Sequence, residues 1–205
     1  MKVFGIVLAV IVGLVVIVGM MIWTGRSGLI SRSQGVDAQW GQVQNVYQRR
    51  FDLVPNLVAS VDNFMKRQQQ TLTDVISMRQ RVVDLKSSLD TALLRQNPGL
   101  LDSISAQLSR QLNSFINMVA EQYPEIKGEQ DYTDLMTQLE GTENRITQER
   151  RAYNEVVREY NVYRQSGIRA LAAGAIFGFP YEKTYFAAEA GAQTAPNVKD
   201  IFENK

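Results

Sequence analysis

The 205 residues suit one soluble domain plus an attached segment, and their charges nearly cancel, with 22 basic and 21 acidic side chains. A neutral chain lacks the basic face that a nucleic-acid binder needs to release phosphate counterions, so we expect no nucleic-acid partner. The chain contains no cysteine and no histidine, which excludes disulfides, thiol chemistry, histidine-based catalytic triads and most zinc sites, and we expect no cofactor.

An uncharged apolar run, 3-VFGIVLAVIVGLVVIVGMMIW-23, lies near the start of the chain. As a helix its 21 residues would span about 30 Å, which is the hydrocarbon thickness of a bilayer, and Trp23 would lie at the interface. A cleaved signal peptide is the alternative, but this run is longer than a signal-peptide core and ends in bulky residues. The run therefore predicts a retained single-pass anchor.

The orientation of this anchor stays open. Lys2 precedes the apolar run, whereas Arg26 and Arg32 follow it. By the positive-inside rule this difference of one charge favours a cytoplasmic domain, and counting the terminal amine removes the difference.

Apolar residues at alternating steps of three and four run from position 40 to position 89, after a Gly- and Ser-rich stretch at 24–35. The fifteen positions hold Trp40, Val43, Tyr47, Arg50, Val54, Leu57, Val61, Phe64, Gln68, Thr71, Val75, Met78, Val82, Leu85 and Leu89. Twelve of the fifteen are apolar or aromatic, which predicts one amphipathic helix from about residue 32 to about residue 96. Further apolar residues beside this stripe make it wide, which favours a helical bundle over a two-stranded coiled coil.

Pro55 lies inside this stretch, within 49-RRFDLVPNLVASV-61. Proline cannot donate a backbone hydrogen bond to the carbonyl of Phe51, and its ring crowds that turn of a helix. A kink in one helix and a break between two helices both fit these facts. No glycine or turn cluster flanks Pro55, so the sequence favours the kink.

Two further helices are predicted after position 96. Asn97 and Pro98 have the residue types of an N-cap and a first helical position, and an apolar stripe then runs through residues 101–119. The segment 122-QYPEIKGEQD-131 interrupts this pattern with its proline and glycine. A second helix is expected from about residue 132 to about residue 166.

The order of these helices leaves two paths open. In the first, which we favour, residues 98–122 and 131–166 both return along the long helix, so that position 50 faces positions 145–150. In the second, the chain reverses at residues 123–130 and a three-helix bundle results.

The end of the chain has a different composition. The segment 168-IRALAAGAIFGFPYEKTYF-186 is apolar and rich in small residues, but it is too short for a second span. It fits packing across the bundle, which we favour, or a position on the membrane surface. Residues 187–205 are expected to form a poorly ordered tail, whose apolar hook comprises Val198, Ile201 and Phe202.

The chain is thus expected to have three parts. An anchor and linker (1–31) precede a helical bundle (32–166), and a short apolar helix with the C-terminal tail (167–205) follows the bundle.

Several motifs resemble those of the LemA family, and they occur in that family's order. They are 49-RRFDLVPNLVASV-61, 123-YPEIKGEQDY-132, 140-EGTENRI-146, 151-RAYNEVVREYN-161 and 177-FGFPYEKTYF-186. Family members usually carry Phe-Pro after the Tyr-Asn repeat, where this chain reads 165-QSGIRAL-171. The turn into the last helix is therefore expected to differ from the family's pattern.

The resemblance implies a fold and a location more than a reaction. LemA proteins are membrane-anchored helical bundles with a single N-terminal span, and the family has no established activity. Some members are encoded beside membrane proteases, and one branch is tied to the shaping of a bacterial membrane organelle. We therefore expect an all-α, LemA-like antiparallel bundle in a bacterial plasma membrane.

The residues that carry the resemblance are the candidate functional residues. They are Arg50, Asp52, Pro55, Asn56, Glu143, Asn144, Arg145, Tyr153, Asn154, Tyr160, Asn161 and Phe186. Arg50 occupies a core-facing position of the stripe, and an unpaired buried charge costs several kcal/mol. We therefore expect Arg50 to bind a carboxylate within residues 140–149, and on the favoured path Asp52 and Asn56 meet residues 140–146. The carboxylate candidates are Glu140, Glu143 and Glu149.

Two pairs of motif residues are seven positions apart, so each pair shares one helix face. These are Tyr153 with Tyr160 and Asn154 with Asn161. Interhelical hydrogen bonds that set the register are the favoured interpretation, and a surface for another protein is the alternative.

Two functions fit the sequence. The first is a membrane-anchored helical scaffold that self-assembles, organises the membrane and has no catalytic activity. The second is an accessory subunit that binds a membrane protease or another membrane complex. Carboxylates such as Asp52 and Glu140 could pair as acid and base, but the sequence has no Gly-rich phosphate loop, nucleophile motif or metal-spaced ligand set. Exposed apolar, Asn or Gln positions on one face would favour the first function, and a compact polar monomer the second.

Overall fold

The computed structural model describes residues 2–68 and 73–187. Within these ranges the chain forms five α-helices and one 3-10 helix, and no strand occurs there. The elements are α1 Lys2–Arg67, α2 Thr73–Leu94, α3 Pro98–Gln122, η1 Pro124–Gly128, α4 Gln130–Gln165 and α5 Ile168–Phe177. The predicted all-α fold is confirmed.

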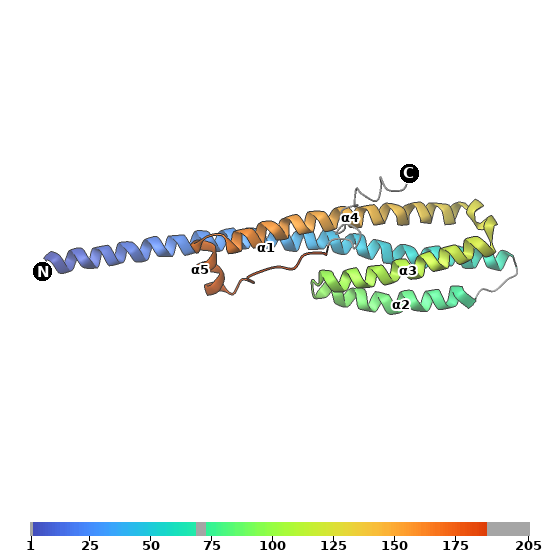
Figure 1. The fold of residues 1–205 in the computed structure, drawn as a ribbon, viewed down its shortest axis with the longest axis horizontal. Coiled ribbons are helices and arrows are strands. Elements are labelled where there is room, and N and C mark those ends of the chain that lie inside the picture. The colour runs from blue at the N-terminus through green and yellow to red at the C-terminus, as the bar shows by residue number, and fades with distance from the viewer. Residues whose placement is uncertain (1, 69–72, 188–205) are drawn as a thin grey trace, which may run out of the picture.

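Helix α1 is one uninterrupted helix that joins the apolar run to the bundle (Figure 1). Residues 3–20 are exposed along their whole length, and α1 is the one described helix that is long and apolar enough to cross a membrane. Residues 24–35 belong to the same helix, so their Gly and Ser content does not produce a linker.

Pro55 lies within α1, and its side chain is exposed. The helix continues through this position, so the interpretation of Pro55 as a break between two helices is wrong. Because the ring points to the solvent side, the proline does not interrupt the apolar face that α1 presents to the core.

The prediction of one helix over residues 32–96 is wrong, because α2 runs antiparallel to α1 (Figure 1). An ion pair joins Asp62 Oδ2 to Arg79 Nη2 at 3.0 Å, and a second joins Asp52 Oδ1 to Lys86 Nζ at 2.8 Å. The partners are farther apart in sequence for the second pair than for the first, as the two arms of a hairpin require.

The apolar stripe itself is confirmed on both arms of this hairpin. Its described positions are buried from Trp40 to Phe64 on α1 and from Val75 to Leu89 on α2. The stripe loses its apolar character at Gln68 and Thr71, within 67-RQQQT-71. This polar interruption was the local signal that one helix does not extend across the region.

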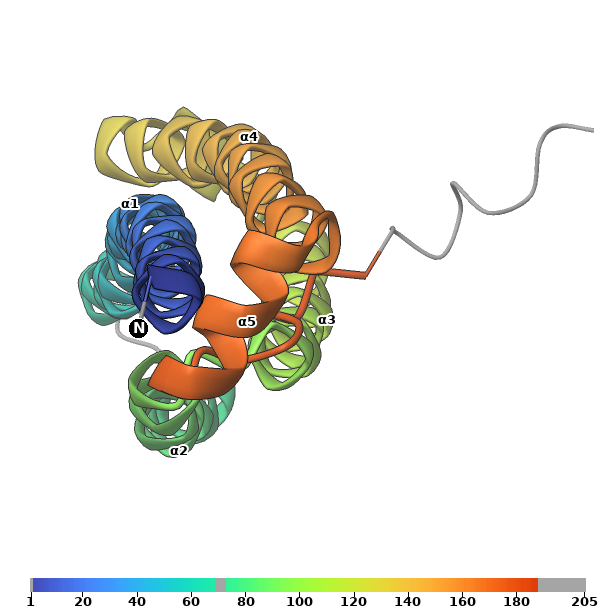
Figure 2. The same ribbon diagram turned by 90° about the vertical axis from the view of Figure 1, so that its left-hand side faces the viewer.

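Asn97 caps α3 as predicted, since its Oδ1 accepts a hydrogen bond from the backbone N–H of Leu100 at 3.0 Å. The 3-10 helix η1 then reverses the chain between α3 and α4. The favoured path, with both later helices returning along one long helix, is therefore wrong, and the reversal at 123–130 is right. Because α2 also reverses, the bundle has four antiparallel helices instead of three (Figures 1 and 2).

Helices α1 and α4 form the long pair of the molecule (Figure 1). The α2–α3 hairpin covers the half of α1 that is farther from the N-terminus, whereas α5 crosses the nearer half and residues 179–187 follow α1 from there toward the hairpin. Trp40 lies on α1 where the α2–α3 hairpin and residues 179–187 meet. Its Nε1 donates to the carbonyl oxygen of Leu93 at 3.1 Å, and its ring stacks on Phe186 with centroids 6.0 Å apart.

Two glycines with positive φ bound α5. Gly167, at φ +105°, makes the turn from α4, and Gly178, at φ +72°, ends α5 in the left-handed region that favours glycine. Gly167 lies within 165-QSGIRAL-171 and makes the turn into the last helix there. The predicted apolar hook at Val198, Ile201 and Phe202 lies outside the described residues.

The core of the bundle is apolar, and complete burial of a side chain such as Leu57 or Leu108 stabilises the fold by about 1.5–3 kcal/mol. Among the described residues, the buried polar or charged side chains are Arg50, Thr142, Asn161 and Arg164. Buried polar groups need hydrogen-bond partners, and the partners of Arg50 and Asn161 define the two sites below.

Candidate functional site

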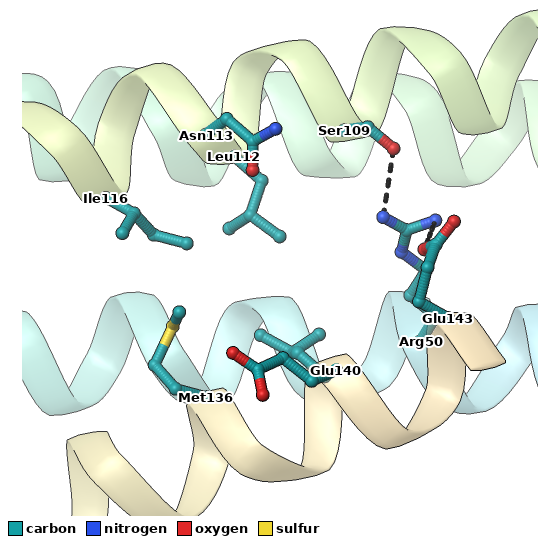
Figure 3. A pocket seen from close by; sticks show the side chains of 9 residues that line it. Arg50, Ser109, Leu112, Asn113, Ile116, Met136, Glu140 and Glu143 are labelled. Atoms are coloured by element: carbon teal, nitrogen blue, oxygen red, sulfur yellow. Dashed lines mark hydrogen bonds and ion pairs between the residues drawn. The ribbon is translucent and has the colours of Figure 1, made fainter. Parts of the chain in front are cut away.

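The first site is an ion pair inside the bundle. Arg50 projects from α1, and its Nη1 lies 2.6 Å from Glu143 Oε2 on α4 (Figure 3). The same guanidinium donates to two hydroxyls of α3, to Ser105 Oγ at 3.2 Å and to Ser109 Oγ at 2.9 Å. The prediction that Arg50 binds a carboxylate of residues 140–149 is confirmed.

The two partners of this pair differ in their access to water. The side chain of Arg50 is 7% exposed, whereas that of Glu143 is 52% exposed. The arginine therefore depends on protein partners for its hydrogen bonds, and the glutamate does not. Arg50 links three helices of the bundle at this level.

A second ion pair, absent from the sequence-based prediction, lies beside the first. Arg150 of α4 has its Nη2 3.2 Å from Asp102 Oδ1 of α3, and it also donates to the backbone carbonyl of Ala187 at 3.0 Å. Its guanidinium stacks 5.2 Å from the ring centre of Phe186. Arg150 flanks the α4 stripe between Ile146 and Tyr153, and that position was the only signal for its role.

Tyr47 of α1 is fully buried close to these charges. Burial raises the pKa of its hydroxyl well above the usual range, because the ionised form would lose its hydration. Tyr47 therefore stays in its neutral form and packs within the core.

A cleft of about 360 Å³ opens beside Arg50 between α3 and α4 (Figure 3). Its lining residues are Arg50, Ser109, Leu112, Asn113, Ile116, Met136, Leu139, Glu140 and Glu143. Four of these nine side chains are apolar and five are polar or charged, and the Arg50–Glu143 ion pair lies at one end of the cleft.

Asp52 and Asn56 do not meet residues 140–146, so this part of the prediction is wrong. At 100° per residue these two side chains lie roughly 200° and 240° around α1 from Arg50, and both are exposed. Asp52 instead pairs with Lys86 of α2, and Asn56 lines a shallow pocket that includes Asp131. Helical periodicity alone was sufficient to separate them from Arg50.

Asn144 and Arg145 follow Glu143 on α4, but they point outward and are exposed. Arg145 lines a surface pocket together with Arg49 and Glu149. Of the motif 140-EGTENRI-146, the structure brings Glu143 to Arg50 and buries Thr142 and Ile146 in the core.

The second site is a pair of asparagines on α4 that bind the backbone of residues 179–187. Asn154 donates through Nδ2 to the carbonyl of Phe186 at 3.1 Å and accepts from the N–H of Phe186 at 2.8 Å. Asn161 makes the same two bonds to Lys183, at 2.9 Å and 2.8 Å. Asn154 and Asn161 therefore join α4 to a non-helical segment, and not to another helix as their spacing had predicted. We call this arrangement the asparagine clamp.

The spacing of the clamp follows from backbone geometry. Seven residues of α-helix rise about 10.5 Å, and three residues of extended chain cover about 10 Å. Asn154 and Asn161 are seven apart, and their partners Phe186 and Lys183 are three apart. The antiparallel segment can therefore place a backbone amide opposite each asparagine without distortion.

Aromatic rings close one end of the clamp. Phe186 is buried against Trp40 and Tyr153, with a centroid distance of 5.3 Å to the tyrosine. Burial raises the pKa of Tyr153 to about 12, and the charge of Asp37 adds to the increase. At the other end the hydroxyl of Tyr160 donates to the carbonyl of Pro180 at 2.7 Å.

The motif tyrosines and asparagines thus act on the chain's own C-terminal segment. The bonds go to backbone groups, which every residue type carries, so the clamp recognises an extended backbone and the aromatic pocket selects Phe186. In the described ranges, no three Asp or Glu side chains come together in a way that could hold a metal ion.

Comparison with known proteins agrees with the motifs. The family model described as the LemA family matches residues 39–199, which begins just before Trp40 and includes both sites. No curated protein matches the chain. Because the family model covers most of the chain, the protein belongs to the LemA family.

Proposed function

We propose that this protein is a membrane-anchored helical scaffold without catalytic activity, which self-assembles and organises the membrane around it. The observation that carries the proposal is the continuity of α1, which contains both the apolar run and the bundle core in one helix. Because no linker interrupts this helix, the position and tilt of the membrane span fix the position and tilt of the bundle. A scaffold protein needs such a rigid connection.

The surface of the α2–α3 hairpin supports self-assembly. On α2 the exposed apolar residues Ile76, Val83 and Leu94 lie on one line, because steps of seven and eleven residues return to the same side of a helix. On α3 the exposed positions between residues 103 and 117 carry one charge, Arg110. Helix α2 also exposes six charged side chains, so the apolar line on α2 together with the weakly charged side of α3 is the part of this surface that another protein could cover.

A second candidate function is that of an adaptor for a membrane protease or another membrane complex. The cleft between α3 and α4 favours it, since it combines four apolar side chains with the carboxylates of Glu140 and the half-exposed Glu143. A basic amphipathic segment of a partner would fit that combination.

The native mass of the detergent-solubilised full chain distinguishes the two functions. Self-assembly predicts a multiple of the monomer mass, and Val83→Glu should reduce that mass because it places a charge on the α2 line. Val162→Glu is the matched control, since Val162 is also an exposed valine but lies on α4. A wild-type monomer would remove the self-assembly proposal and favour the adaptor.

We propose further that the chain stays in a bacterial plasma membrane through residues 3–23. The apolar run and the family membership support this location, and the side of the bundle is left to experiment. The intact mass of membrane-extracted protein tests retention. A mature chain that starts near residue 24 and is recovered in the soluble fraction would contradict the anchor.

A further inference from the structure

We infer that α5 is a second membrane-contacting element, which lies flat in the bilayer interface at the level where the apolar run of α1 ends. The inference rests on the proposed anchor, and it assigns a lipid contact to a helix that does not span the bilayer. Four observations on α5 carry it, namely its level along α1, its direction across α1, the composition of its outer face and the side chains around it.

The level of α5 is set by its contact with Gly25. A Cβ at this position would collide with the backbone carbonyl of Arg169 and would lie 3.3 Å from Ala173 Cβ, so the backbones of α1 and α5 approach closely there. Gly25 is two residues beyond Trp23, which is about 3 Å along α1. A helix with its side chains has a radius of about 5–6 Å, so α5 extends back past the end of the uncharged run.

The direction of α5 is crosswise. In Figure 1 it stands across α1, and in Figure 2, which looks along α1, it is seen from the side while the bundle helices are seen nearly end on. A helix that crosses a membrane anchor in this way lies parallel to the membrane plane.

The two faces of α5 differ in what they contact. Its small residues Ala170, Ala173 and Gly174 are buried against the rest of the molecule. The opposite side exposes large apolar residues, including Ile168 at 73% and Ile176 at 60%. Nothing in the described chain covers these residues, and a lipid environment at this level would.

The side chains around α5 are those of a membrane interface. Arg26 lies between two exposed rings, 5.8 Å from the centre of Trp23 and 5.0 Å from that of Phe177. Arg169 adds a second cation, on α5 itself, and its side chain is exposed. Aromatic rings together with arginines mark the headgroup level of membrane proteins, and the apolar residues beside them enter the acyl boundary.

The end of α4 holds α5 in this orientation. The guanidinium of Arg164 is buried against Gly174, where a Cβ would collide with it, and it lies 5.4 Å from the ring centre of Tyr181. Helix α5 is thus tied to both long helices. A flat helix fixed in this way would set the depth and tilt of the rod that α1 forms.

Quenching by brominated lipids tests the inference in the full chain, because the absence of cysteine allows single labelled positions. An environment-sensitive fluorophore is attached to Leu171→Cys, Ile176→Cys, Val12→Cys and, as the water control, Ser103→Cys, each in vesicles that contain brominated phospholipid. We expect quenching at positions 12, 171 and 176 and none at position 103.

The outcomes separate the inference from the proposed function. Quenching at position 12 without quenching at positions 171 and 176 overturns the inference and leaves the anchor intact. No quenching at position 12 overturns the anchor. A blue-shifted but unquenched label at positions 171 and 176 also overturns the inference, because it would mean that protein and not lipid covers α5.

A displaced α5 provides the second test. Gly25→Leu should separate α5 from α1 and reduce the quenching at position 171 at least several-fold, while position 12 remains quenched. Gly35→Leu is the matched control, since a Cβ at Gly35 meets nothing within 4 Å. Equal quenching at position 171 in both variants would contradict the assigned level of α5.

Discussion

At the scale of single residues, Arg50 and Glu143 form a pair whose members should respond unequally to mutation. Glu143→Ala leaves a buried guanidinium with two serine hydroxyls and no counter-charge, so we expect a loss of stability on the order of 2 kcal/mol. Arg50→Met should cost less than about 1 kcal/mol, because methionine fits the apolar seam and Glu143 already reaches water. Urea unfolding of the detergent-solubilised chain measures both values.

Glu140→Ala is the control for this pair, since Glu140 lines the same cleft one turn away and no ion pair joins it to Arg50. Its effect should be within about 0.5 kcal/mol. A larger loss of stability for Arg50→Met than for Glu143→Ala would contradict this prediction. It would mean that the charge of Arg50 stabilises the fold even though Glu143 is half exposed.

The asparagine clamp makes a second prediction at this scale. Asn154→Ala removes two hydrogen bonds to Phe186, each worth about 0.5–1.5 kcal/mol. The equilibrium constant for local opening of the bound segment should therefore rise by a factor of roughly 10 to 100. Hydrogen exchange at the amide of Phe186 measures this opening. Asn144→Ala, on the exposed side of the same helix, should leave exchange unchanged, and equal protection in both variants would show that the aromatic pocket alone holds the segment.

At the scale of the elements, the reversal between α1 and α2 determines the shape of the bundle. A continuous helix would place residues 62 and 79 about 25 Å apart, whereas in the hairpin their side chains form an ion pair of 3.0 Å. We therefore expect Asp62→Cys/Arg79→Cys to react readily with a short bifunctional thiol reagent. The pair Asp62→Cys/Leu94→Cys should not, because α2 carries Leu94 away from Asp62. Cross-linking in neither variant would contradict the hairpin.

At the scale of the whole molecule, buried tyrosines make stability depend on pH in alkaline solution. An unfolded tyrosine ionises near pH 10, and burial raises the pKa of Tyr153 to about 12 in the folded chain. Between these values the unfolded state binds fewer protons, so stability falls as pH rises from about 10 to about 12 and does not change for this reason below pH 10. Tyr47 and Tyr160, whose pKa values burial also raises, act in the same direction.

Tyr153→Phe should make this alkaline loss smaller, since the phenyl ring keeps the packing and cannot ionise. Unfolding free energies between pH 8 and about 12, together with tyrosinate absorbance, measure the effect. Tyr185→Phe makes the same substitution at a more exposed ring and is the matched control variant. Equal curves for wild type and Tyr153→Phe would exclude Tyr153 as a source of the loss.

The sequence alone determined the features that depend on local patterns. Periodicity identified the buried positions from Trp40 to Phe64 and from Val75 to Leu89, residue chemistry identified the cap at Asn97, and the cost of a buried charge predicted a carboxylate partner for Arg50. The motifs also identified the LemA family. Each of these conclusions follows from the properties of neighbouring residues or from the free energy of one side chain.

Only the tertiary structure decided how the helices are connected in space. A stripe with a heptad pattern is equally satisfied by one long helix and by two helices that fold back on each other, because both bury the same positions. The partner of Asn154 was equally open, since a side-chain amide can bind a helix, an extended segment or another protein. The path of the chain brings an extended segment to Asn154. This segment, residues 183–186, lies about thirty residues further along the chain, and its backbone amides have the spacing of Asn154 and Asn161.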